Sequence, residues 1–88
     1  MDAQREVPGT GYHVRAMSAG DMIDLEQSGV DGIAGLVRLA QFSTINGDGK
    51  RVWSTEAEAR DAPWPVVKAC ADEALIANGL TGDDLSGN

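Results

Sequence analysis

An apolar segment in the middle of the chain, residues 30–42, sets the strongest limit on the fold. Its large residues surround a narrow polar stripe formed by Asp31 and Arg38. A helix that is apolar on most of its sides must be covered by other elements, so we expect this one to be central. Gly32 and Gly35 each cost about 1 kcal/mol relative to alanine inside a helix, which indicates either close backbone packing or a softer helix.

One strand and one helix are predicted before this segment. Residues 11–17 alternate apolar and polar side chains with the period of a short strand. Ser18 is a suitable helix N-cap, and Gly29 would end a helix of about ten residues. The side chains that this helix is expected to bury are Met22, Ile23 and Leu25.

A dense turn signal follows the central helix at residues 46–49, Asn-Gly-Asp-Gly. The flanking residues 42–45 and 51–53 form either a small hairpin or two extended ends. A calcium loop of the EF-hand type needs an oxygen ligand at its fifth position, and Lys50 stands there. The pattern therefore favours a tight turn over a metal site.

The last part of the chain predicts two helices separated by prolines. Thr55 and Glu58 fit a capping box for a short helix, which residues 63–65, Pro-Trp-Pro, must stop. The final helix begins at one of these prolines. It ends at Gly79-Leu80, which is typical of a Schellman ending.

These elements fit in one domain, because a chain of 88 residues forms only one modest core. We expect a mainly α fold: a small single domain of four short helices with an N-terminal strand and the optional hairpin, spanning residues 11–80. Residues 1–10 read as a flexible lead-in that packs little. Residues 81–88 read as a disordered acidic tail.

Charge limits the kinds of partner. The net charge is −7 and the basic residues form no cluster, which disfavours binding to nucleic acid or to an anionic membrane surface. No segment approaches the roughly 18 apolar residues of a membrane span, and residues 1–6 lack the pattern of a secretion signal. Cys70 is the only cysteine, which fits a reducing cytosol.

Few side chains in the sequence are candidates for catalysis or metal binding. His13 is the only histidine, and nothing in the sequence ties it to a nucleophile. Glu56 with Arg60, and Lys68 with Asp72, have the spacing of ordinary pairs on a helix surface. We therefore expect a non-enzymatic protein with no catalytic, cofactor-binding or metal-binding residues.

Apolar and aromatic side chains are the better candidates for function. Trp53 and Trp64 bracket the short helix, where tryptophan either seals a small core or anchors a partner. The candidate partner-binding residues are Val37, Trp53, Trp64, Val67 and Leu75.

The order of motifs in the second half of the chain carries a resemblance. The end of the apolar helix and the residues after it, 39–45, lead to Asp-Gly-Lys-Arg-Val-Trp at 48–53, then to Ser-Thr-Glu at 54–56, and finally to Ala-Asn-Gly-Leu-Thr at 77–81. This order and spacing resemble the signature stretch of the tail assembly chaperones of long-tailed bacteriophages. The match covers about half of the chain, and the strand and the Ser18-capped helix before it agree in order and type.

Membership of this family would imply a bacteriophage or prophage protein that binds the tape measure protein, keeps it soluble and helps to recruit tail tube subunits during tail morphogenesis. It would act in the host bacterial cytoplasm, use no cofactor and be absent from the mature virion. Self-association is compatible with such a role, although the periodicity does not demand it. The alternative is a small structural virion protein for head-tail joining or tail completion.

Overall fold

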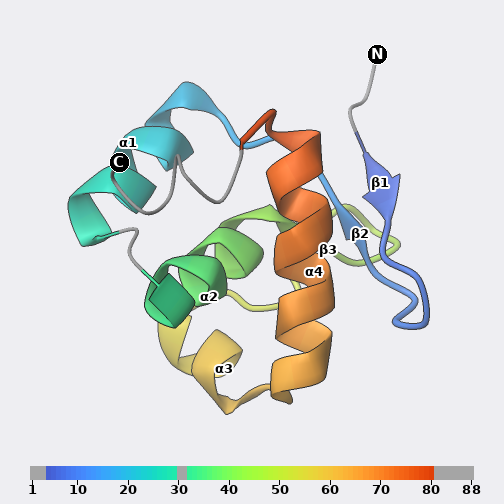
Figure 1. Ribbon diagram of the computed structural model, residues 1–88. Helices are drawn as coiled ribbons and strands as arrows, with labels where there is room; N and C mark the ends of the chain where they lie inside the picture. The colour runs from blue at the N-terminus through green and yellow to red at the C-terminus, as the bar shows by residue number, and fades with distance from the viewer. Residues whose placement is uncertain (1–3, 30–31, 81–88) are drawn as a thin grey trace.

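Four helices and three very short strands make up the part of the computed structural model that is described, residues 4–29 and 32–80 (Figure 1). The strands are β1 (Arg5–Glu6), β2 (His13–Val14) and β3 (Thr44–Ile45), and the helices are α1 (Ala19–Ser28), α2 (Gly32–Ser43), α3 (Glu56–Asp61) and α4 (Trp64–Ala77). The mainly α fold expected from the sequence is confirmed. None of these helices has the length and apolar character that crossing a membrane requires.

The core lies between α2, α4 and the sheet. Helix α2 packs chiefly on α4 and also contacts α1 and α3, while β1 and β2 lie against α4 (Figure 1). On α4 the buried residues recur at i, i+3, i+4 and i+7, which makes one apolar stripe. These residues are Val67, Cys70, Ala71 and Ala74. Three of the four are small, so neighbouring elements can approach α4 closely.

Helix α2 is central, as predicted, but its first turn is not covered. Gly35, Leu39 and Ala40 are buried, whereas the Ile33 side chain is 65% exposed. Gly32 begins the helix with a φ of +62°, and no atom lies within 4 Å of the position where a Cβ would stand. Close packing at Gly32 is therefore the wrong explanation, because this glycine serves the backbone conformation. Residues 30 and 31, included in the expected helix, lie outside the described residues.

The sheet is antiparallel with the order β1-β2-β3, and it is shorter at β2 than the predicted strand of residues 11–17. Arg5 pairs with Val14, and the backbone N–H of Val7 donates to the carbonyl of Tyr12 at 2.9 Å. Val7 is fully buried. The expectation that residues 1–10 pack little is therefore wrong for Arg5, Glu6 and Val7, which join the sheet and the core.

Helix α1 begins where the sequence predicts. The Ser18 hydroxyl accepts a hydrogen bond from the backbone N–H of Asp21 at 3.0 Å, and Gly29 follows the helix with a φ of +93°. Leu25 is buried, but Ile23 is 55% exposed, so the expected burial of Ile23 is wrong. A single apolar stripe on a short helix at the edge of the domain does not reach both residues.

The turn after α2 is present, with only a rudimentary hairpin. The side-chain Oδ1 of Asn46 accepts from the backbone N–H groups of Asp48 and Lys50, at 2.9 and 3.1 Å. A bridge between Ile45 and Arg51 closes the turn. Phe42 lies in the last turn of α2, where the predicted central helix ends, and Ser43 also belongs to this helix rather than to an extended segment beside the turn.

The beginning of α3 and the end of α4 follow their sequence signals, whereas α4 begins at Trp64 rather than at Pro63 or Pro65. Thr55 Oγ1 accepts from the backbone N–H of Glu58 at 3.2 Å, while the Glu58 carboxylate accepts from the N–H of Ser54 rather than from that of Thr55. At the end of α4 the N–H of Leu80 donates to the carbonyl of Leu75 at 2.8 Å, and Gly79 donates to Ile76 at 3.1 Å. This is the predicted Schellman ending. The tail of residues 81–88 lies outside the described residues.

Candidate functional site: an apolar groove

A pocket of about 470 Å³ opens between α2, α3 and the beginning of α4. Its lining residues are Ile33, Ala34 and Val37 from α2, Glu56, Ala59 and Arg60 from α3, Ala62 from the following turn, and Trp64 and Val67 from α4. We call this pocket the groove. Most of its lining is aliphatic or aromatic, a composition typical of binding sites for apolar ligands.

The sizes of the side chains explain why the groove is hollow. Alanines occupy positions 34, 59 and 62, where longer side chains would fill the space. Val67 is buried at 1% exposure, while Ile33 and Trp64 are 65% and 41% exposed. The groove therefore combines a buried residue with two large apolar side chains that remain accessible to solvent.

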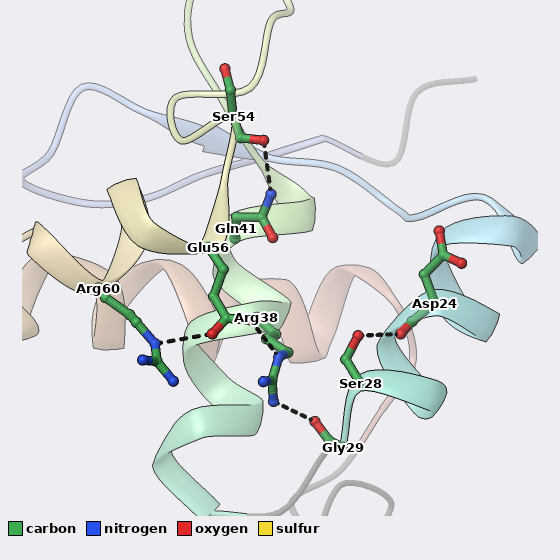
Figure 2. A network of polar contacts seen from close by, with 8 residues as sticks. All are labelled: Asp24, Ser28, Gly29, Arg38, Gln41, Ser54, Glu56 and Arg60. Carbon is green, nitrogen blue, oxygen red and sulfur yellow. Dashed lines mark hydrogen bonds and ion pairs between the residues drawn. The ribbon is translucent and has the colours of Figure 1, made fainter.

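An ion-pair network fixes one side of the groove (Figure 2). Glu56 accepts from the Nε of Arg38 at 2.8 Å through Oε1, and its Oε2 lies 3.0 Å from the Nε of Arg60. Arg38 also donates through Nη1 to the carbonyl of Gly29 at 3.1 Å. The Glu56 carboxylate thus joins α3 to α2. The Arg38 guanidinium joins both helices to the residue that follows α1.

Two further contacts in Figure 2 hold the neighbouring segments. Gln41 donates from its side-chain amide to the carbonyl of Ser54 at 3.3 Å, just before α3 begins. The Ser28 hydroxyl donates to the carbonyl of Asp24 at 2.7 Å in the last turn of α1. Arg38 and Gln41 of α2 therefore hold α3 and the residue before its N-cap, while the Ser28 bond is local to α1.

Three of the five predicted partner-binding residues, Val37, Trp64 and Val67, line the groove. Trp53 does not. It is 7% exposed and packs edge-on against Tyr12, with ring centroids 6.1 Å apart and an interplanar angle of 75°. Leu75 lies near the opposite end of α4, partly buried against the core. The structure thus gives Trp53 and Leu75 positions within the packing of the domain.

The sequence analysis missed the residues that give the groove its depth and its charge. Ala59 and Ala62 carry no sequence signal, because the absence of a side chain matters only once a neighbouring helix faces it. Glu56 and Arg60 were identified as a helix-surface pair, which is confirmed. Nothing in their spacing shows that Arg38, from another helix, joins the same carboxylate.

Cys70 and His13 lie apart from the groove lining. Burial raises the pKa of the Cys70 thiol, and the Thr44 side chain acts in the opposite direction with a smaller effect. A buried thiol with a raised pKa is a poor nucleophile at neutral pH. Within residues 4–29 and 32–80, no three His, Cys, Asp or Glu side chains come together in a way that could hold a metal ion.

Comparison of the chain with protein-family models, with curated proteins and with solved structures finds no match.

Proposed function

We propose that this protein is a non-enzymatic tail assembly chaperone that binds a helical segment of a phage tape measure protein in the groove. The observation that supports this proposal most directly is the accessible apolar lining around Ile33, Trp64 and Val37. Grooves of this kind take the apolar stripe of an amphipathic helix, which inserts side chains spaced at i, i+3, i+4 and i+7. The family resemblance of residues 39–81 supplies the identity of the client.

The mechanism is reversible masking. A long helical client exposes apolar stripes that aggregate in water, and covering them with the groove removes apolar surface from both proteins. The net charge of −7 keeps the resulting complex soluble through repulsion between copies. The client becomes available for recruitment of tail tube subunits when this chain dissociates.

The first experiment is co-expression with the tape measure protein of the phage or prophage that encodes this chain, followed by size-exclusion chromatography with light scattering. We expect the two proteins to elute together, with the client soluble only when this chain is present. The stoichiometry of the complex follows from its mass, and the mass of this chain alone reports whether it self-associates.

Two matched variants connect the binding to the groove. Trp64→Ala removes an exposed apolar side chain from the groove, and Ile76→Ala removes one from α4 outside the groove lining. We expect Trp64→Ala to lower the yield of soluble client and Ile76→Ala to leave it unchanged. Precipitation of the client regardless of this chain, with the two proteins eluting separately, would refute the chaperone proposal. Recovery of the protein in finished particles would instead support a structural virion component.

A further inference from the structure

We infer that the groove selects a helix whose apolar stripe is flanked by carboxylate side chains, which pair with Arg60. This inference rests on the proposed function and names the chemistry of the client segment. A client with carboxylate side chains is not what the overall charge predicts, because a net charge of −7 by itself favours a basic client.

The charges at the groove are distributed differently from those of the whole chain. Among the described lining residues, Glu56 is the only anion, and both of its carboxylate oxygens already contact arginine. Two guanidinium groups, those of Arg38 and Arg60, therefore share one carboxylate. The cluster of these three residues carries a net positive charge beside an apolar surface.

Arg60 is the member of this cluster that remains available. Its side chain is 63% exposed, and it approaches Glu56 through Nε. In residues 4–29 and 32–80, its two terminal nitrogens make no other ion pair or hydrogen bond. Arg38, in contrast, is 19% exposed and also donates to the carbonyl of Gly29. An incoming carboxylate would thus meet the Nη groups of Arg60, which suit two parallel hydrogen bonds.

A peptide helix fits this site better than a fatty acid, although both could bring a carboxylate to an apolar pocket. Ile33 and Trp64 lie at the groove and are 65% and 41% exposed. An acyl chain confined to the pocket would cover only the parts of these two side chains that line it. A helix lying across the groove would cover them and place a flanking carboxylate beside the rim.

The test uses three synthetic amphipathic peptides of about 20 residues, because shorter helices are marginal in water. They share one leucine stripe and carry Glu, Gln or Lys at the positions flanking it. Dissociation constants are measured by calorimetry with the full chain near 0.15 M salt, where screening beyond about 8 Å suppresses the effect of the net charge. We expect the Glu peptide to bind about fivefold more tightly than the Lys peptide, the value of one exposed ion pair.

Variants of the full chain identify the residue responsible. Arg60→Gln should abolish the preference, and Arg60→Glu should reverse it in favour of the Lys peptide. Lys68→Gln is the matched control, because it makes the same change in net charge at another i, i+4 ion pair that is not part of the groove. It should leave the fivefold preference intact. The circular dichroism of each variant verifies that it is folded.

Equal affinities for the three peptides, a preference for Lys in the original chain, or an unchanged preference in Arg60→Gln would overturn the inference. Failure of all three peptides to bind would do the same, as would tighter binding of lauric acid than of any peptide. None of these results decides the chaperone proposal, which depends on whether co-expression keeps the tape measure protein soluble. The two proposals can therefore fail separately.

Discussion

Asn78 joins two segments that lie far apart in the sequence. Its side-chain Oδ1 accepts from the backbone N–H of Met17 at 2.6 Å, and its Nδ2 donates to the carbonyl of Ala74 at 2.8 Å. The amide therefore ties the residue before the N-cap of α1 to the last turn of α4. The sequence identifies Asn78 only as part of a helix ending, since the partner at Met17 depends on the tertiary fold.

Replacing Asn78 with alanine should destabilise the protein by about 1–2 kcal/mol, because both hydrogen bonds disappear and the partly buried Met17 N–H loses its acceptor. For a domain of this size, each kcal/mol corresponds to a fall in the melting temperature of about 4–8 °C. Thermal unfolding followed by circular dichroism measures the change. Gln27→Ala, at an exposed position of α1, is the control. A melting temperature of Asn78→Ala equal to that of the control would contradict this role.

The two tryptophans show where prediction from single residues fails. Trp53 and Trp64 have the same side chain, yet Trp53 is 7% exposed and Trp64 is 41% exposed. The difference arises because Trp53 meets Tyr12 from the N-terminal segment, while Trp64 begins α4 at the edge of the groove. Such a difference depends on contacts between distant segments, which residue type alone does not encode.

At the scale of the element, the end of α4 allows a test of whether a glycine is required for its positive φ. Gly79 has a φ of +66°, and Gly47 lies in the turn after β3 without a positive φ. At both positions, no atom lies within 4 Å of the place where a Cβ would stand. The two glycines are both exposed and differ mainly in backbone conformation.

Gly79→Ala should therefore lower the free energy of unfolding by about 1–2 kcal/mol, the penalty for an L-residue in the left-handed region. Gly47→Ala should be neutral or stabilise the protein by up to about 1 kcal/mol, because it restricts the unfolded chain without straining the folded one. Urea unfolding of the two variants gives both values. Equal effects of the two substitutions would show that the positive φ at Gly79 contributes nothing to the choice of residue.

Elements bounded by strong local signals were predicted well, and elements formed by pairing were not. Ser18, Thr55 and Gly79 mark helix ends through contacts within a few residues, so the sequence contains the whole cause. Strand β1 has only two residues and exists because β2 pairs with it. No local pattern in residues 1–10 distinguishes such a strand from a loop.

At the scale of the molecule, the groove also depends on contacts between separate elements, which local sequence signals do not show. Its walls come from three helices, and its hollow centre depends on Ala34, Ala59 and Ala62 meeting in space. The sequence can identify apolar candidates such as Val37 and Trp64, but it cannot show that small residues from separate helices face one another. The Arg38–Glu56 contact, which fixes α3 against α2, likewise joins residues from two elements.

The N-terminal segment packs against the rest of the domain. Val7 is fully buried, and the Nε of Arg5 lies 3.2 Å from a carboxylate oxygen of Glu73 on α4. The Arg5 side chain is 45% exposed, so this ion pair contributes little to stability. Burial of Val7 is the larger effect, and it places the beginning of the folded domain before residue 11.

Val7→Ala should consequently destabilise the protein by about 2 kcal/mol, through lost apolar burial and the cavity left behind. Glu6→Ala, at the exposed neighbouring position of β1, should change stability by less than about 0.5 kcal/mol. Denaturant unfolding measures both, and removal of residues 1–10 should cost at least as much as Val7→Ala. Because the groove lining lies on α2, α3, the following turn and α4, Val7→Ala should retain peptide binding well below its melting temperature. An unchanged stability of Val7→Ala would instead indicate that the folded domain begins at residue 11.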